Sequence, residues 1–366
     1  MRKLSAVFVL MIAIMFSGCF PSGVKDASTS NDFTEDKTFE YKAPHIDVSF
    51  EIPQIQNALP TRIKLKEKSF DTNEMLKLFF DGKTILPEKT WEGNFYTDDN
   101  SLLCVNSNSL SFYEGKMAPL KEFQIDAPLN YQAVLCVSEE YFRALYDIGE
   151  ELDDFPSETA LNRANELIST LGITSLGEPE IYAFSVDTLK KLKEISFSFA
   201  FNEKYPLTKD NEVYVLKFQQ VFNGIELADA DTSIKDNTDE SGSFPISHPN
   251  VTIGVSKDKI FYFDTGEIYE KEGEILNSDM PEYDLNFALS ELKNYLEKSH
   301  FSVQTVIDKA KLVYYPIERN EEGYVEYSLA WCFEGYVGSK VEGDVTKNDY
   351  KKFVLCENGT WLDFEG

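Results

Sequence analysis

Histidine is scarce in this sequence, where His45, His248 and His300 are the only three among 366 residues. They lie far apart, and no cysteines stand at metal-ligand spacing to complete a zinc site with them. His-Glu-x-x-His, Gly-x-Ser-x-Gly and a glycine-rich phosphate loop are also absent. Nucleophilic catalysis needs a serine or cysteine beside a base that a third group holds. We therefore assign no catalytic residue and no cofactor, and we expect a protein that is not an enzyme.

The sequence is short of basic residues. Lys and Arg number 35 against 63 Asp and Glu, which gives a formal net charge of −28. A polyanion is repelled at that charge, so nucleic acid is excluded as a partner. Basic proteins, peptides and divalent cations are compatible with it, although solubility is the simplest explanation of an acidic surface.

Long apolar runs are absent except at the N-terminus, where a short basic segment precedes an apolar stretch at 4–16. As a helix this stretch spans about 20 Å, less than the ~30 Å hydrocarbon core, which indicates a signal peptide. The Ser-Gly pair before Cys19 resembles the lipobox of bacterial lipoproteins. We predict that residues 1–18 are removed and that lipid on Cys19 holds the protein on the extracytoplasmic face of the cell membrane. An ordinary secretory signal cleaved nearby is the alternative.

Residues 19–44 contain few large apolar side chains and many Ser, Thr and Asp residues. Such a segment cannot bury enough surface to order itself, which predicts a flexible tether. The rest of the chain is long enough for two or three domains. We predict an N-terminal α+β region at 45–150 and two units of a helix plus an antiparallel sheet, at 151–275 and 276–366.

Three segments have the periodicity of amphipathic helices, beginning near Asp71, Ser157 and Asp284. Alternating apolar and polar positions in runs such as 195–201 and 311–317 indicate strands with one buried face, and hence antiparallel sheets. We therefore predict an α+β fold of two or three repeated units, each a helix packed on an antiparallel sheet.

Several short motifs in the second half of the chain resemble a known family. Phe-Gln-Gln-Val-Phe-Asn-Gly-Ile-Glu-Leu at 218–227 resembles a strand–turn signature in the propeptides of thermolysin-like metalloproteases. Lys-Leu-Val-Tyr-Tyr-Pro at 311–316, Leu-Ala-Trp at 329–331 and Asn-Gly-Thr at 358–360 resemble the PepSY-type unit that ends those propeptides. The resemblance covers roughly residues 195–366. It implies a module that inhibits a peptidase, in trans because this chain holds no peptidase motif, or that acts on a signalling protein near the envelope.

Four cysteines remain besides Cys19, an even number that permits two disulfides in an exported chain. Cys332 and Cys356 lie in two apolar runs joined by a polar loop, so we predict a possible cross-strand disulfide between them. Cys104–Cys136 is the other possible pair. Free buried thiols are the alternative for all four.

One run has the spacing of a calcium loop. Asp229, Asp231, Ser233 and Glu240 place oxygen atoms at the first, third, fifth and twelfth positions. Ile234 stands where the sharp turn of such a loop requires glycine. A polar loop between strands is therefore the preferred interpretation, and we assign no metal site.

The sequence favours a binding or regulatory protein whose partner is a protein or a peptide, captured by strand addition at an exposed sheet edge. A glycan- or solute-binding lipoprotein would instead need a deep pocket lined by aromatic side chains. An unrecognised hydrolase would need converging carboxylates or a histidine beside serine or cysteine.

Overall fold

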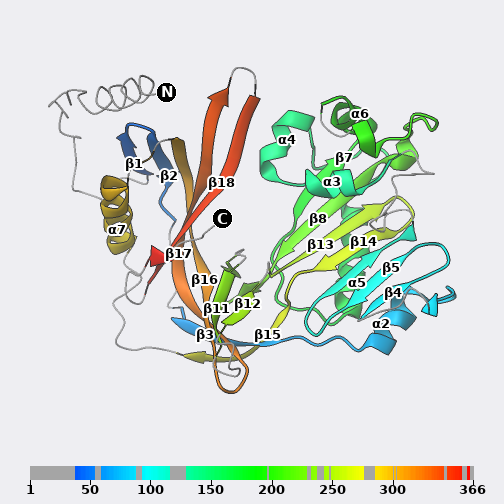
Figure 1. The fold of residues 1–366 in the computed structure, drawn as a ribbon, viewed down its shortest axis with the longest axis horizontal. Helices are drawn as coiled ribbons and strands as arrows, with labels where there is room; N and C mark the ends of the chain where they lie inside the picture. Colours follow the sequence, from blue (N-terminus) through cyan, green and yellow to red (C-terminus); the bar gives the residue numbers. More distant parts are fainter. Residues whose placement is uncertain are drawn as a thin grey trace, which may run out of the picture.

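The computed structural model describes residues 38–53, 59–87, 93–115, 129–195, 198–228, 232–236, 243–246, 249–275, 285–299, 301, 303–341, 344–356 and 361–362. These residues form two large sheets, of twelve and seven strands, that lie side by side (Figure 1). Within these ranges no helix is long and apolar enough to cross a membrane. Cys19 and the predicted signal peptide lie outside the described residues, whereas β1 (Thr38–Ala43) forms inside the segment predicted to be a tether.

The predicted α+β fold of repeated helix-on-sheet units is wrong, because the described chain is mostly β and its distant segments share sheets. β3 (Arg62–Glu67) pairs on one side with β15 (Tyr269–Ile275) and on the other with β17 (Val325–Val341). Periodicity identifies a strand and its buried face, but it carries no information about which distant strand lies beside it.

The three predicted helices form where the sequence placed them. α2 (Thr72–Phe79) begins after Asp71, whose carboxylate accepts a hydrogen bond from the Glu74 N–H at 3.0 Å, as an N-cap does. α5 (Ser157–Thr170) and α7 (Leu285–Lys298) are the other two.

The strand predicted at 195–201 does not form. α6 (Val186–Ile195) ends where that strand was expected to begin, and a 3-10 turn at Ser198–Ala200 follows. Phe201, just after the turn, is buried in the core beneath α6. Over so short a run, alternation cannot distinguish a strand from a turn whose side chains pack into a core.

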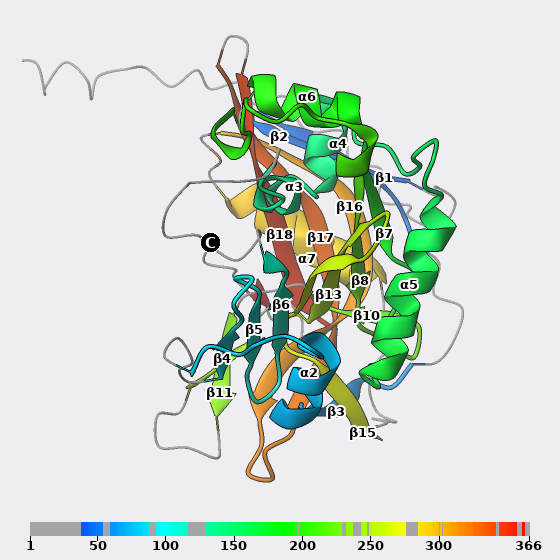
Figure 2. The same ribbon diagram turned by 90° about the vertical axis from the view of Figure 1, so that its right-hand side faces the viewer.

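The seven-stranded sheet is antiparallel throughout and is covered on both faces. Tyr214 and Leu216 pack under α2 and α5, whereas Val213 and Val215 pack under the other helices, which explains why their strand is a nearly continuous apolar run. Figure 2 shows α5 along one side of this sheet. Its strands in spatial order are β4 (Asn94–Tyr96), β5 (Leu102–Val105), β6 (Leu110–Tyr113), β14 (Ile260–Thr265), β13 (Asn250–Ser256), β8 (Val213–Gln219) and β7 (Glu180–Phe184); the other helices are α3 (Gln132–Cys136), α4 (Glu140–Tyr146) and α6.

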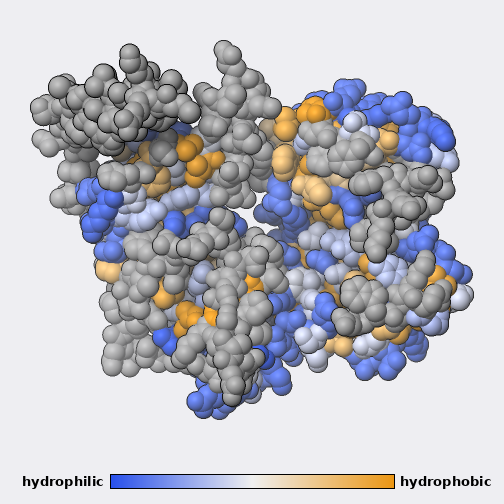
Figure 3. All heavy atoms as spheres, viewed as in Figure 1, coloured by the Kyte–Doolittle hydropathy of each residue, from blue (hydrophilic) through white to orange (hydrophobic). Residues whose placement is uncertain are grey.

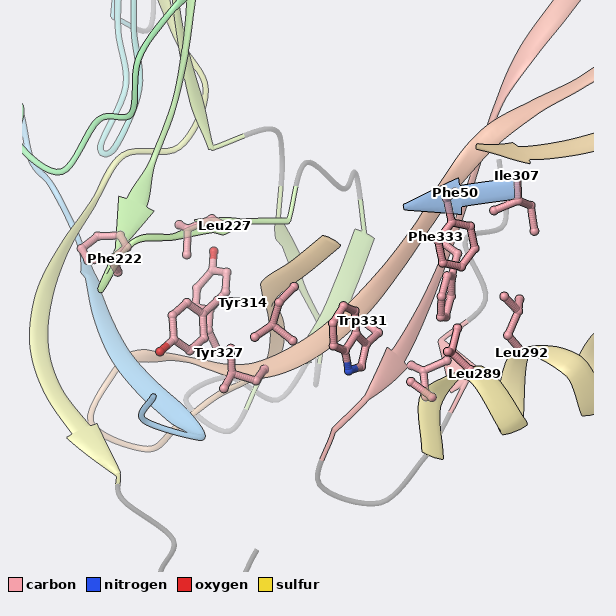
Figure 4. Close-up of a cluster of buried hydrophobic side chains, with 14 of the residues drawn as sticks. Phe50, Phe222, Leu227, Leu289, Leu292, Ile307, Tyr314, Tyr327, Trp331 and Phe333 are labelled. Atoms are coloured by element: carbon pink, nitrogen blue, oxygen red, sulfur yellow. The ribbon is translucent and has the colours of Figure 1, made fainter. Parts of the chain in front are cut away.

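The twelve-stranded sheet is built around the long strands β16 (Gln304–Arg319), β17 and β18 (Asp344–Leu355). α7 covers it on the side away from the seven-stranded sheet (Figure 1), and Leu289 and Leu292 of this helix point toward Phe333 (Figure 4). The remaining strands, besides β1, β3 and β15, are β2 (Ile46–Glu51), β9 (Val221–Phe222), β10 (Ile225–Leu227), β11 (Thr232–Asp236), β12 (Ser243–Ile246) and β19 (Trp361–Leu362).

The buried side chain of Gln220 forms hydrogen bonds between two of the segments that connect the two sheets. Gln220, which is fully buried between β8 and β9, donates from its side-chain Nε2 to the Tyr269 carbonyl at 3.0 Å. Its Oε1 accepts the Tyr269 N–H, also at 3.0 Å. Tyr269 is the first residue of β15, so this amide links the segment between β8 and β9 to the start of β15.

We predict that Gln220→Leu lowers the free energy of unfolding by about 2 kcal/mol, because it leaves a buried N–H and a buried carbonyl of Tyr269 without partners. Urea denaturation measures the change. Gln304→Leu, at an exposed position of β16, is the matched control and should change stability little. Equal effects of the two substitutions would contradict the role assigned to Gln220.

Candidate functional site

A cleft with a volume of about 420 Å³ lies between the two sheets and is the candidate functional site. The space-filling view shows a notch between the two halves of the molecule, with hydrophilic residues beside it (Figure 3). Charged side chains dominate its lining, which consists of Glu139, Glu178, Glu180, Tyr182, Lys217, Phe218, Gln219, Glu226, Asn250, Lys311, Glu334 and Lys351.

A second hollow, of about 270 Å³, lies under α2 and α5 and is mostly apolar. Phe79 and Phe112 line it, together with Lys83. The Lys83 ammonium is already engaged by Asp99, at 3.1 Å, and by the Ser101 hydroxyl, at 2.8 Å. The cleft is the stronger candidate because both sheets contribute charged groups to it. Charged groups are costly to bury, so their concentration in one cleft favours a binding role for it.

The wall on the seven-stranded sheet combines a lysine, glutamates and a tyrosine. Glu180 of β7 lies opposite Lys217 of β8, and the Lys217 Nζ is 2.5 Å from Glu139 Oε1. Tyr182 donates its hydroxyl hydrogen to Glu180 Oε2 at 2.6 Å, and the guanidinium of Arg143 lies 4.2 Å from the centre of its ring. Burial raises the pKa of Tyr182, and the hydrogen bond to Glu180 raises it further, so the tyrosine is a neutral donor at physiological pH.

The wall on the twelve-stranded sheet is centred on Lys311 of β16. Its Nζ lies 3.0 Å from Glu226 Oε2 and 3.1 Å from Glu334 Oε1, so two carboxylates from different strands converge on one ammonium. Burial alone would lower the pKa of Lys311, but the charges of Glu334 and Glu226 raise it above the ordinary value. The ammonium therefore remains charged.

The thiol of Cys332 lies at the same wall, 3.6 Å from Glu334 Oε1. Only 1% of its surface is exposed, and burial together with the charge of Glu334 raises its pKa well above that of an ordinary thiol. A buried, protonated thiol is a poor nucleophile. We therefore assign Cys332 to packing.

The cysteines of the two predicted disulfides lie in or beside both sheets. Cys332 lies opposite Phe353 and packs with the small cluster facing the cleft, whereas Cys356 packs against the large core on the α7 side. The two side chains therefore lie on opposite faces of the sheet, and this arrangement does not favour the predicted Cys332–Cys356 disulfide. Cys104 on β5 and Cys136 at the end of α3 are present as thiols.

Most of the calcium candidates lie outside the described residues, namely Asp229, Asp231 and Glu240. Ser233 belongs to β11, which pairs with β12 and β16, so its backbone is that of a strand and not of a calcium loop. In the described part of the chain no group of three or more His, Cys, Asp or Glu residues could hold a metal ion.

The cleft could not be predicted from local sequence patterns. Glu226 and Lys311 lie in different family-like motifs, and their contact joins residues 85 positions apart. One signal was available, namely single charged residues inside apolar strands, such as Lys217 in Val-Tyr-Val-Leu-Lys-Phe-Gln and Glu334 in Trp-Cys-Phe-Glu-Gly. Such a residue must find a partner or a cavity when its strand is buried.

Comparison with known proteins supports the fold alone. No protein-family model matches the chain, and no curated protein matches it. The fold is similar to the crystal structure of an uncharacterized protein from Eubacterium rectale, with a TM-score of 0.57 and 15% sequence identity. The match covers 90% of this chain and 94% of that chain. The resemblance to PepSY-type propeptide units therefore stays a prediction.

We predict that Lys311→Met lowers the free energy of unfolding by about 1 kcal/mol at low salt, since Glu226 and Glu334 would then repel each other without a cation between them. The value is modest because the Lys311 side chain is 41% exposed, and salt should reduce it. The pKa of Lys311 is raised in the folded state, so the contribution is fully present below the ordinary lysine pKa of about 10.4 and is lost only as the pH rises above it.

Urea denaturation at neutral pH and at two salt concentrations measures this effect. Lys190→Met is the control, because Lys190 on α6 forms a more exposed ion pair with Asp187. A loss of stability that is the same for both variants would show that the two carboxylates do not depend on Lys311.

Proposed function

We propose that this protein is an extracytoplasmic lipoprotein, anchored to the cell membrane through lipid on Cys19, that acts as a non-enzymatic binding or regulatory module. Its partner in this proposal is a protein or a peptide. The observation that carries the binding role is the cleft of about 420 Å³ between the two sheets, which is within the size range of small-ligand sites, about 300–1,000 Å³.

The composition of the cleft supports a peptide in preference to a sugar. Among the described residues, two aromatic side chains line it, and both are buried: Tyr182 is 0% exposed and Phe218 is 3% exposed. Neither offers the open ring face on which a sugar would stack. The amide groups of Gln219 and Asn250 and the charged side chains around them suit the polar backbone and side chains of a peptide.

A regulatory role toward a peptidase or a signalling protein rests on the family resemblance. Phe218, Gln219 and Glu226, from the segment that resembles the propeptide signature, line the cleft together with Lys311 from the PepSY-like segment. The residues that carry the resemblance and the residues that form the cleft are thus partly the same. A peptidase or a signalling protein in the envelope is the partner we propose.

The first test concerns the anchor. Cells that express the full chain should incorporate labelled palmitate into the protein, and the Cys19→Ala variant should incorporate none, because the thioether forms on that sulfur. Equal labelling of the two proteins would refute lipidation at Cys19.

The second test concerns the ligand. The purified full chain is incubated with a tryptic digest of casein or with a mixture of oligosaccharides, and the retained molecules are identified by mass spectrometry. We expect retention of peptides, and in the Lys217→Glu/Lys351→Glu variant the ratio of basic to acidic peptides retained should rise about tenfold, because both substitutions make the cleft more negative.

The matched control is Lys190→Glu/Lys298→Glu, which makes the same change of charge at exposed positions outside the cleft. It should retain peptides as the wild type does. Retention of oligosaccharides in place of peptides would contradict the proposal, and so would an equal shift toward basic peptides in the two double variants.

A further inference from the structure

We propose that the cleft between the sheets selects ligands that carry cationic groups, the ammonium of lysine or the guanidinium of arginine in a peptide segment. This inference rests on the proposed function and names the chemistry of its ligand. The preference for cations follows from which charged side chains of the cleft already form ion pairs within the protein and which do not.

Two of the three lysines that line the cleft form ion pairs with glutamates of their own wall, and the third, Lys351, lies opposite Glu334 in the register of β17 and β18. Lys217 is held by Glu139 at 2.5 Å, and Lys311 is held by Glu226 at 3.0 Å and by Glu334 at 3.1 Å. These ammonium groups are therefore already engaged, which makes them poor receptors for an incoming carboxylate.

The remaining carboxylates of the cleft belong to Glu180, the first residue of β7, and to Glu178, two residues before it. Glu180 accepts the hydroxyl hydrogen of Tyr182 at 2.6 Å, a bond that orients the carboxylate without neutralising its charge. Among the residues that the structure describes, neither glutamate forms an ion pair with a lysine or an arginine. A cation entering the cleft would find two carboxylates able to accept charge-assisted hydrogen bonds.

The sum of charges supports the same conclusion. Of the residues that the structure describes, five glutamates and three lysines line the cleft, and their formal charges sum to −2. The formal charge of the whole chain is −28, so the surrounding field also attracts cations and repels anions. The cavity of about 420 Å³ has room for side chains of a peptide.

Binding of three probes to the full chain, purified in detergent, tests this inference by calorimetry at low and physiological salt. The probes are blocked trilysine, blocked triglutamate and the polyamine spermidine. We expect trilysine to bind and triglutamate not to bind. Glu178→Gln/Glu180→Gln should weaken trilysine binding about tenfold, because the amides keep the shape and the acceptor atoms but lose the charge.

The matched control is Glu158→Gln/Glu166→Gln, which removes the same charge from the exposed face of α5. Its affinity for trilysine should equal that of the wild type. A similar loss in both double variants would overturn the inference, because the attraction would then come from the overall field, and so would equal binding of triglutamate.

Two further outcomes distinguish free polyamines from peptides as the source of the cation, and distinguish a failure of this inference from a failure of the proposed function. Spermidine that competes with trilysine and loses affinity in the Glu178→Gln/Glu180→Gln variant would support the site and assign it to free polyamines as well. If casein peptides bind in a manner that depends on Lys217 and Lys351 but show no preference for basic sequences, the proposed function stands and this inference fails.

Discussion

The relative position of the two sheets depends on the hydrogen bonds of Gln220. Its backbone N–H donates to the Pro249 carbonyl at 3.2 Å, and its backbone carbonyl accepts the Leu227 N–H at 2.9 Å. Its side-chain amide bonds both backbone groups of Tyr269. One buried residue thus joins the connections that follow β8, precede β13 and precede β15. Because the walls of the cleft belong to different sheets, the shape of the cleft depends on these bonds.

The charged cleft is compatible with a large apolar core because sheet geometry separates the two. Along β17, Trp331 and Phe333 point to the core beneath α7, whereas Cys332 and Glu334 point to the other face. Successive side chains of a strand alternate between the faces of its sheet. The same strand therefore contributes to the stability of the core and to the chemistry of the cleft, and a charge change on the cleft face need not disturb the core.

The sequence predicted local features well and long-range features poorly. The cap at Asp71 and the stripes of α5 and α7 are encoded in neighbouring residues, and these helices form as predicted. The pairing of β3 with β15 and β17 is not encoded in neighbouring residues, because these strands are separated by about 200 residues or more in the sequence. Close approaches are equally hidden: a Cβ at Gly335 would lie 1.8 Å from the Val306 carbonyl oxygen, a constraint that only the paired strands reveal.

The likeness to a protein with 15% sequence identity indicates that many different sequences can form this fold. A fold that persists at so low an identity is specified mainly by the alternation of apolar residues and by strand pairing, which many sequences satisfy. The side chains on the cleft face of β8 and β16, such as Lys217 and Lys311, contribute little to that pattern. Their identities can therefore vary without a cost to the fold, so the proposed ligand preference depends on the charges of the cleft and not on the likeness of the fold.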